Sequence, residues 1–208
     1  CALPILLLDP KPNEIILDAC AAPGGKLSHI IQIQPDLKKL IGFEVDIKRF
    51  TTLNNSLKRL DLDNNSKLEI YCQDAINLQN KYADNYFDKI LIDAPCSATG
   101  IIRRQPDIQI HRCEDDLKLI KNTQIEILKS LWPKLKAGGH MLYATCSILK
   151  DENDTQIEKF IELFKDASVI KLNLPFGQKT KFGWPILPNE SSISADGFYY
   201  SIIYKNKA

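Results

Sequence analysis

Two cysteines follow hydrophobic runs that predict buried strands, and this placement indicates covalent chemistry. One is Cys96, in the segment 93–97 (DAPCS), and the other is Cys146, in the segment 144–147 (ATCS). A thiolate is the reactive form of cysteine, and it can attack the poorly electrophilic C6 of a pyrimidine ring. An enzyme reaches such a ring in a nucleic acid only after the base has left its stack. The two cysteines therefore predict the modification of cytosine.

A turn of small residues follows the first predicted strand and ends at Lys26. Its other members are Cys20, Ala21, Ala22, Pro23, Gly24 and Gly25. Small residues let a ligand approach the backbone, and a helix that starts near Leu27 would offer unpaired N–H groups to a carboxylate or a phosphate. The dinucleotide pattern GxGxxG is missing from the sequence, and so is the phosphate loop GxxxxGK followed by Ser or Thr. A small cofactor with a carboxylate therefore fits this turn better than a nucleotide polyphosphate.

Acidic residues stand where the second and third predicted strands end. The carboxylate of Glu44 can accept hydrogen bonds from both ribose hydroxyls of a nucleoside, whether in NAD or in S-adenosylmethionine, or it is a solvated acid at a strand end. Asp46 is better placed to cap the following helix. Asp74 can accept a hydrogen bond from an adenine amino group or form a turn. Together these acids indicate a cofactor that contains a nucleoside.

The composition predicts one globular domain. The chain has 208 residues, of which 44% are hydrophobic and 25% are charged, enough to bury one substantial core. The longest apolar run, residues 5–8, is far too short to span a bilayer, and no basic segment precedes a signal-like hydrophobic core. We expect a soluble, cytoplasmic monomer that makes no membrane contact.

The net charge of +1 neither requires nor excludes a polyanionic partner, because local patches steer nucleic acids. A basic cluster follows Cys96 and consists of Arg103, Arg104, His111 and Arg112. It is either a set of phosphate contacts beside the site or a solvated surface. Six cysteines without a CxxC pair predict free thiols and no metal site, with Cys20 and Cys72 as small core residues.

Short apolar runs alternate with amphipathic stretches along the chain. Five runs predict buried parallel strands, at residues 14–18, 39–44, 68–72, 89–94 and 139–145. Apolar residues at helical spacing predict helices packed on the sheet, around residues 50–60, 117–131 and 157–164. The fold class is therefore α/β, with a doubly wound, mostly parallel sheet whose ligands bind beyond the carboxyl ends of its strands.

Three further features complete the predicted architecture. Gly138 and Gly139 fit a turn into the fifth strand. The segment 198–204 predicts a late strand that runs antiparallel at one side of the sheet. The segment 175–197, with its prolines and glycines, predicts a long loop.

Four segments together resemble the RNA cytosine-5 methyltransferases and, more narrowly, the bacterial RsmB (Sun/Fmu) group. They are 18–26 (DACAAPGGK), 93–100 (DAPCSATG), 103–107 (RRQPD) and 143–147 (YATCS). The resemblance runs from about Glu14 to the segment 196–198. It implies that residues 1–208 form one catalytic domain with a Rossmann-like methyltransferase fold. It also implies S-adenosylmethionine as the methyl donor and a specific cytosine of small-subunit (16S) ribosomal RNA as the substrate.

The resemblance further implies an N-terminal RNA-binding domain similar to NusB. No such domain is present in the sequence, which starts abruptly at Cys1 and enters its first predicted strand within about a dozen residues. We therefore expect that an upstream domain has been removed.

The resemblance also implies roles for particular residues. Cys146 resembles the nucleophile, and Cys96 resembles the second cysteine that assists release of the methylated product. The turn from Cys20 to Lys26 would form the cofactor pocket together with Glu44, Asp74 and Asp93, although family members often have Asp where this chain has Glu44. The RNA strand would be held near Cys96 by Arg103, Arg104 and Asp107.

The expected mechanism starts with addition of the Cys146 thiolate to C6 of cytosine, which turns C5 into a carbon able to attack a methyl donor. Charge that develops at N3 needs a proton or a strong hydrogen bond, which Asp93 is placed to supply if it is protonated or bridged by water. Lys26 would orient Asp93 or lower the pKa of a thiol. Cys96 would act as a base or relay when the C5 proton leaves.

Several alternatives stay open on the sequence alone. The substrate could be transfer RNA or another RNA, and the chain could be a catalytically silent RNA-binding module that keeps the fold. An enzyme that methylates exocyclic nitrogens often has an aromatic residue where this chain has Cys96, and a DNA cytosine enzyme would need only that one thiol. A dehydrogenase is disfavoured because the dinucleotide pattern is missing.

Overall fold

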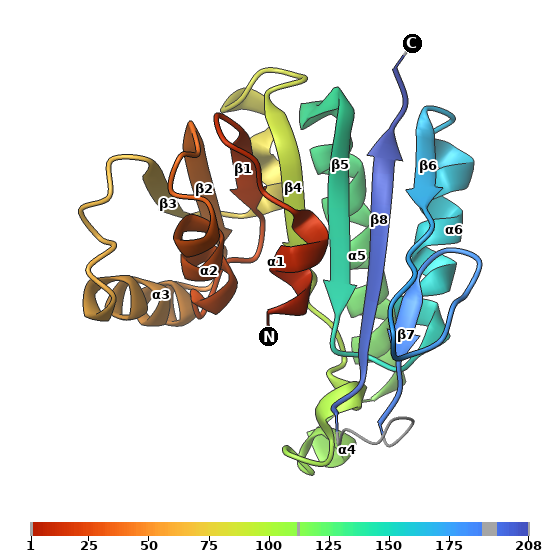
Figure 1. The fold of residues 1–208 in the computed structure, drawn as a ribbon. Coiled ribbons are helices and arrows are strands. Elements are labelled where there is room, and N and C mark those ends of the chain that lie inside the picture. Colours follow the sequence, from red (N-terminus) through yellow and green to blue (C-terminus); the bar gives the residue numbers. More distant parts are fainter. Residues whose placement is uncertain (1, 112, 189–194, 208) are drawn as a thin grey trace.

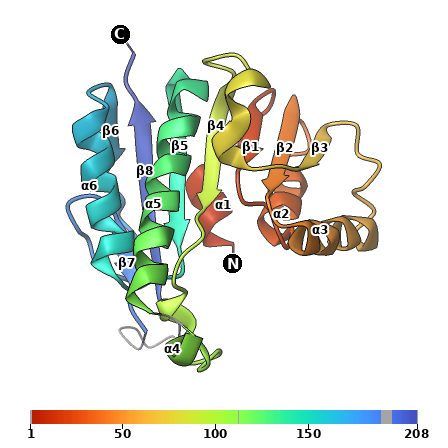
Figure 2. The ribbon, with the colours of Figure 1, turned by 180° about the vertical axis from the view of Figure 1, so that it is seen from behind.

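The computed structural model describes residues 2–111, 113–188 and 195–207. Within these residues one mixed sheet has the strand order β3-β2-β1-β4-β5-β8-β6, and β7 pairs with β8 outside this path. Helices α1, α2 and α3 lie on one face of the sheet (Figure 1), and α5 and α6 cover the other face (Figure 2). The predicted doubly wound α/β architecture is confirmed.

The five predicted parallel strands are all present. They are β1 (Ile15–Asp18), β2 (Lys39–Glu44), β3 (Leu68–Cys72), β4 (Phe87–Asp93) and β5 (Leu135–Thr145). Each is parallel to its neighbour in the order β3-β2-β1-β4-β5. The central strands have apolar side chains toward both faces because helices cover both, and β1 is buried along its whole length. Their carboxyl ends therefore meet at one edge of the sheet.

The helices follow the predicted spacing of apolar residues. The long ones are α2 (Gly25–Ile33), α3 (Ile47–Arg59), α5 (Glu114–Leu131) and α6 (Asp154–Leu163), and the short ones are α1 (Leu3–Leu8) and α4 (Ile108–His111). Short 3-10 segments are η1 (Ala75–Asn80), η2 (Thr99–Ile101), η3 (Trp132–Lys134) and η4 (Lys150–Glu152). The sequence did not predict α1, because its apolar run is too short to show helical spacing over a second turn.

The late strand β8 (Phe198–Lys205) runs antiparallel to β5, as predicted. It does not lie at the side of the sheet, however, because β6 (Ala167–Ile170) pairs with its other edge. The prediction of one long loop over 175–197 is also wrong, because β7 (Trp184–Ile186) lies within it and pairs with β8. Both missed strands are only three or four residues long, too short to show a period. Part of the predicted loop, 189–194, lies outside the described residues.

Two smaller predictions need correction. The two glycines 138 and 139 lie within β5 and not in a turn before it; Gly138 has φ +84°, and the register against β4 shifts at this point. A pair of glycines in the sequence is compatible with an irregularity inside a strand as well as with a turn. Cys72, predicted as a core residue, is exposed because it ends the edge strand β3.

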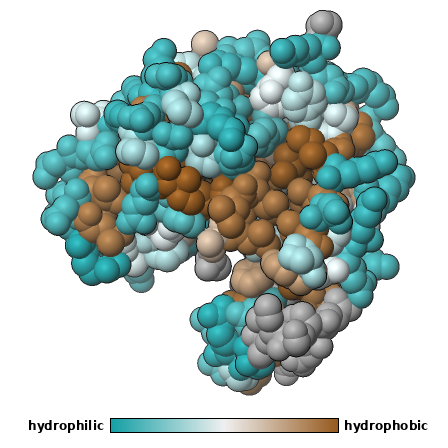
Figure 3. Space-filling view, viewed as in Figure 1, coloured by the Kyte–Doolittle hydropathy of each residue, from teal (hydrophilic) through white to brown (hydrophobic). Residues whose placement is uncertain are grey.

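The core consists of two apolar clusters, one on each face of the sheet. The cluster on the face that carries α1 includes Ile5, Leu8 and Ile202. Hydrophobic side chains gather on the surface around α1 and the neighbouring front of the sheet (Figure 3), where Leu6 is 62% exposed. Among the described residues, no helix has the length and apolar character needed to cross a membrane.

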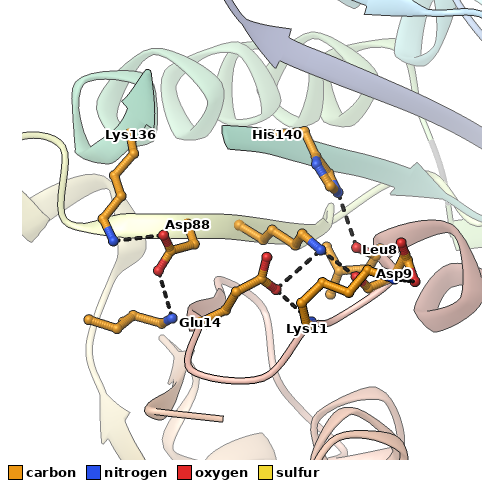
Figure 4. A network of polar contacts seen from close by, with 9 residues as sticks. Leu8, Asp9, Lys11, Glu14, Asp88, Lys136 and His140 are labelled. Carbon is orange, nitrogen blue, oxygen red and sulfur yellow. Dashed lines mark hydrogen bonds and ion pairs between the residues drawn. The ribbon is translucent and has the colours of Figure 1, made fainter. Parts of the chain in front are cut away.

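A polar network stabilises the amino-terminal edge of the sheet (Figure 4). Lys89 is buried there; its Nζ lies 3.1 Å from a carboxylate oxygen of Glu14 and donates a hydrogen bond to the carbonyl oxygen of Asp9. On the same edge, the carboxylate of Asp88 accepts a hydrogen bond from Nζ of Lys136 at 2.7 Å. These contacts attach the segment after α1 to β1 and β4. The opposite, carboxyl edge is the one at which the predicted site residues gather.

Candidate active site

The two cysteines predicted to carry the chemistry lie side by side. Cys146 directly follows β5 and Cys96 follows β4 by three residues, and these neighbouring parallel strands end in register, with Asp93 opposite Ala144. The Sγ atoms of the two cysteines are 3.4 Å apart although 50 positions separate them in the chain. Both side chains are half-buried. The prediction that adjacent strand ends bring the thiols together is confirmed.

The contact between the thiols makes them unequal. A hydrogen bond from Cys96 lowers the pKa of the Cys146 thiol, with a smaller contribution from the positive charge of Lys26, whereas burial and Asp93 act in the opposite direction. The same hydrogen bond, together with burial, raises the pKa of the Cys96 thiol. Cys146 is therefore the thiol that ionises first, and Cys96 is the one that keeps its proton.

Lys26 and Asp93 form an ion pair beside the thiols. Lys26 lies in the first turn of α2, Asp93 is the last residue of β4, and Nζ of Lys26 donates a hydrogen bond to Oδ2 of Asp93. Both side chains remain partly exposed, at 21% for Lys26 and 33% for Asp93. A ligand at this edge of the sheet can therefore reach the pair.

The small-residue turn joins β1 to α2 in a tight path. The peptide bond between Ala22 and Pro23 is cis, and the N–H of Gly24 donates to the carbonyl oxygen of Ala21 at 2.8 Å. Gly24 has φ +103°, and a Cβ there would lie 2.9 Å from a methyl group of Leu53, so only glycine fits. The helix begins at Gly25, slightly earlier than predicted, and a Cβ on Gly25 would meet no atom within 4 Å. The turn thus leaves open space beside the helix N-terminus.

A cavity of about 110 Å³ lies next to this turn. Three of the predicted cofactor residues, Cys20, Glu44 and Asp74, line it. The rest of its wall comes from residues that the sequence did not single out: Ala19, Val45, Arg49, Ala75, Ile76, Pro95, Thr123 and Ile127. Side chains of this kind could flank a flat ring. One signal for them was present in the sequence: Val45 directly follows the predicted acid Glu44, and Ile76 comes two residues after Asp74.

The carboxylate of Glu44 is buried and half satisfied. Oε1 accepts a hydrogen bond from the N–H of Asp46 at 3.0 Å. Oε2 has no hydrogen bond within the described part of the chain, and Nη1 of Arg49 lies 3.5 Å away. The other arm of the Arg49 guanidinium donates to the carbonyl oxygen of Ala22 at 3.1 Å, so Arg49 connects the turn to Glu44. A buried acceptor without a hydrogen bond fits a ligand that donates a hydroxyl group.

The neighbouring acids behave as local caps. Asp46 caps α3 by accepting a hydrogen bond from the N–H of Arg49 at 2.8 Å, which confirms its predicted role. Asp74 accepts a hydrogen bond from the N–H of Ile76 at 2.9 Å, the turn-forming alternative that the sequence left open, and it also borders the cavity. Glu44 is therefore the acid most available to a nucleoside. The turn, the cavity and Glu44 fit the S-adenosylmethionine that the sequence resemblance implies.

The predicted RNA-contacting residues lie on the segment that leads from Cys96 to α4, below the carboxyl edge of the sheet in Figure 1. Arg104 and Arg103 are more than half exposed and approach the carboxylate of Asp196, at 2.6 and 3.6 Å. Asp107 is exposed. Of the two other members of the basic cluster, His111 belongs to α4, whereas Arg112 lies outside the described residues.

Asp18, the last residue of β1, has an electrostatic environment that the sequence did not reveal. Its side chain is fully buried. Burial raises the pKa of its carboxyl group to about 7, an effect that Lys26 partly offsets. Between its ordinary pKa of 3.8 and about 7, the folded chain therefore holds a proton on Asp18 that the unfolded chain has released.

Replacement of Asp18 with asparagine should therefore stabilise the protein at neutral pH. Because the folded state binds the extra proton, the free energy of unfolding of the native chain falls as the pH rises from about 4 to 7. The advantage of Asp18→Asn should grow over this range to about 4 kcal/mol, and urea unfolding at several pH values measures it. If the exposed Asp63→Asn raised the free energy of unfolding equally, or if the effect of Asp18→Asn did not depend on pH, the raised pKa of Asp18 would be contradicted.

Several known proteins with a similar sequence or fold are methyltransferases. The family model described as "16S rRNA methyltransferase RsmB/F" matches residues 5–204. Ribosomal RNA small subunit methyltransferase B from Shewanella oneidensis is 44% identical over 199 residues, which are 96% of this chain and 45% of that protein. The probable ribosomal RNA small subunit methyltransferase B from Coxiella burnetii is 40% identical over 200 residues, 96% of this chain and 46% of that protein.

The chain therefore spans a little under half of the length of these curated relatives. Among solved structures, NSun6 from Pyrococcus horikoshii, whose crystal structure was determined with SFG, superposes with a TM-score of 0.85 at 25% identity, over 99% of this chain and 51% of that one. The methyltransferase fold predicted from the sequence is confirmed.

Proposed function

Because the chain belongs to the RsmB/F family of 16S rRNA methyltransferases, we propose that it transfers a methyl group from S-adenosylmethionine to C5 of a specific cytosine in small-subunit ribosomal RNA. The observation that carries this proposal is the pair of thiols 3.4 Å apart at the carboxyl edge of the sheet. Methylation of an exocyclic nitrogen needs no thiol, whereas addition to C6 followed by elimination uses two groups with different proton affinities. Since this substrate is ribosomal RNA, we expect the protein to act in the cytoplasm.

The cofactor assignment rests on the residues around the cavity. Glu44 would accept hydrogen bonds from the ribose hydroxyls, and Asp74 would border the adenine. The turn from Cys20 to Lys26 would leave room for the amino acid portion. The SFG in the NSun6 crystal structure is an analogue of S-adenosylmethionine, which supports the same cofactor here. Bound S-adenosylmethionine would supply an electrophilic methyl group.

The Cys146 thiolate begins the reaction by adding to C6 of the extruded cytosine. The S–C6 bond forms, and the electron pair of the C5–C6 double bond moves toward C5 and N3, so that C5 becomes nucleophilic. The lowered pKa of Cys146 suits it to this role, since the thiolate is the attacking species. Asp93, held by Lys26, would orient a water molecule that donates to N3.

Release of the methylated base reverses the addition. The C5 proton has to leave, the C5–C6 double bond forms again, and the S–C6 bond breaks. Cys96 can relay this proton, because its Sγ lies 3.4 Å from that of Cys146: it donates its own proton to the departing Cys146 sulfur and takes the proton from C5. Cys146 then loses its proton to solvent, which restores its thiolate and accounts for the one proton that each turnover releases. Arg103, Arg104 and Asp107 would hold the RNA strand next to Cys96.

The test is transfer of a labelled methyl group from S-adenosylmethionine to small-subunit RNA, followed by nucleoside analysis, with transfer RNA as a parallel substrate. We expect 5-methylcytidine in the ribosomal RNA, and a stable protein–RNA adduct when the RNA contains 5-fluorocytidine, whose fluorine blocks loss at C5. A label on another atom, or only in transfer RNA, would overturn the proposed substrate. Binding of S-adenosylmethionine without transfer to either RNA would indicate a silent RNA-binding module instead.

A further inference from the structure

Glu152 is a buried carboxylate six residues after Cys146, at the end of η4, and its solvent exposure is 0%. Three donors reach its side chain. The N–H of Ser97 donates to Oε2 at 2.8 Å, Nε2 of Gln124 donates to Oε2 at 3.1 Å, and Oγ of Ser147 donates to Oε1 at 2.9 Å. A carboxylate in the interior is tolerated only when such donors compensate for its lost hydration.

Two of these donors belong to the residues that directly follow the two cysteines. Ser97 comes after Cys96, and Ser147 comes after Cys146. One carboxylate therefore binds both cysteine-bearing segments, one through each oxygen. The hydroxyl groups of the two serines lie 3.2 Å apart and complete a closed ring of contacts under the thiols.

The position of Glu152 is itself fixed by the sheet and by α5. The hydroxyl group of Tyr143, within β5, donates to the carbonyl oxygen of Glu152 at 2.7 Å. Gln124 of α5 donates both to Glu152 and, at 2.9 Å, to the carbonyl oxygen of Pro95. The neighbouring Asn153 donates to the carbonyl oxygen of Ser147 at 2.8 Å. The carboxylate is thus an anchor with a defined place, to which the two segments are attached.

We propose that Glu152 is a positioning residue that sets the distance between the Cys96 and Cys146 thiols. The Thr99 hydroxyl also contacts both serine hydroxyls, at 3.3 and 3.1 Å, but Glu152 is the described carboxylate that accepts hydrogen bonds from both segments. Without the carboxylate, the N–H of Ser97 and the Ser147 hydroxyl lose their common acceptor, and the two segments can move apart. The positioning of the thiols by Glu152 does not depend on the proposed function. Its catalytic consequence does, because in the proposed reaction addition to C6 needs Cys146 alone, whereas release of the base needs both thiols.

The equilibrium for disulfide formation with oxidised glutathione depends on how closely the two thiols are held. It can be measured without RNA. In this exchange two protein thiols are oxidised to one disulfide, and one oxidised glutathione is reduced to two molecules of glutathione, which take up both protons. The equilibrium constant is the effective concentration of one thiol at the other. Mass spectrometry of peptides identifies the Cys96–Cys146 disulfide separately from mixed disulfides at the exposed Cys72 and Cys113.

The variants are Glu152→Ala, Glu152→Gln and a control, Glu126→Ala, whose exposed carboxylate pairs with Lys129 on α5. We expect Glu152→Ala to lower the effective concentration at least about tenfold. Glu152→Gln should stay within about threefold of the native value, because its amide oxygen can accept from Ser97 and Gln124 while its amide group donates to Ser147. The control should match the native chain.

An effective concentration for Glu152→Ala equal to the native value would overturn the proposal, provided that circular dichroism and binding of a cofactor analogue show the variant folded. If Glu152→Ala does not fold, Ser147→Ala removes one of the three donors and should give a smaller loss; no loss would overturn the proposal equally. With RNA present, Glu152→Ala should accumulate the protein–RNA adduct. A lowered effective concentration without any adduct, in native chain or variant, would count against the proposed function alone.

Discussion

Replacement of Cys146 with alanine should lower methyl transfer to small-subunit RNA by at least about 10⁴-fold, because C5 of cytosine is a weak nucleophile unless a thiolate has added to C6. The measurement is single-turnover transfer of labelled methyl groups at saturating cofactor. Cofactor affinity should change little, since Cys146 does not line the cavity beside Glu44. The adduct with 5-fluorocytidine RNA should disappear in the same variant.

Cys96→Ala is the matched control, because it removes the partner thiol from the same 3.4 Å contact. This variant should still form a bond to the RNA, and it should accumulate the adduct even on RNA without fluorine, since the release step lacks its relay. Loss of the hydrogen bond from Cys96 should also raise the pKa of Cys146, which moves the onset of adduct formation to higher pH. If the adduct required Cys96 and persisted in Cys146→Ala, the two roles would be reversed.

The second large effect is expected for Gly100→Ala. A Cβ at Gly100 would lie 2.2 Å from the carbonyl oxygen of Gly197 and 2.8 Å from that of Cys146, distances that real side chains do not occupy. These atoms are backbone, so the chain has to move. The movement would break the hydrogen bonds from Gly100 N to Cys146 O and from Gly197 N to Gly100 O, both 2.8 Å. We expect a loss of at least about 3 kcal/mol in the free energy of unfolding, measured by urea denaturation.

Gly25→Ala provides the comparison for this effect on stability. Its Cβ would meet no atom within 4 Å, and Gly25 lies at the start of α2, where alanine is the better helix former. Its free energy of unfolding should change by less than about 1 kcal/mol. If Gly100→Ala also changed the free energy of unfolding by so little, the segments that follow β4 and β5 and the segment that precedes β8 would not be packed as tightly as described.

The sequence predicted those parts of the fold and site that depend on local pattern. Runs of apolar residues revealed the five parallel strands, and the end of each strand revealed where Cys96, Cys146, Glu44 and Asp74 stand. Parallel strands place their carboxyl ends at one edge, and this rule alone is enough to bring the two thiols together.

The missed features depend on contacts between distant segments. β6 and β7 are too short to carry a period of their own and exist because they pair with β8. Glu152 lies in a polar segment with no strand or helix pattern, and nothing local distinguishes it from the exposed Asp151 beside it. Its burial follows from α5 and β5 closing over it. The raised pKa of Asp18 likewise comes from the packing around it.

The place of β8 has a consequence for the order in which the molecule is made. β8 is synthesised after every other described strand, yet it fills the gap between β5 and β6, and Gly197, the residue before it, donates a hydrogen bond to Gly100. Until β8 leaves the ribosome, β5 has an open edge and β6 has no partner, so a growing chain cannot hold the segments around Cys146 in their final places. A chain that ends before β8 should therefore fail to bring the Cys96 and Cys146 thiols into the contact described above.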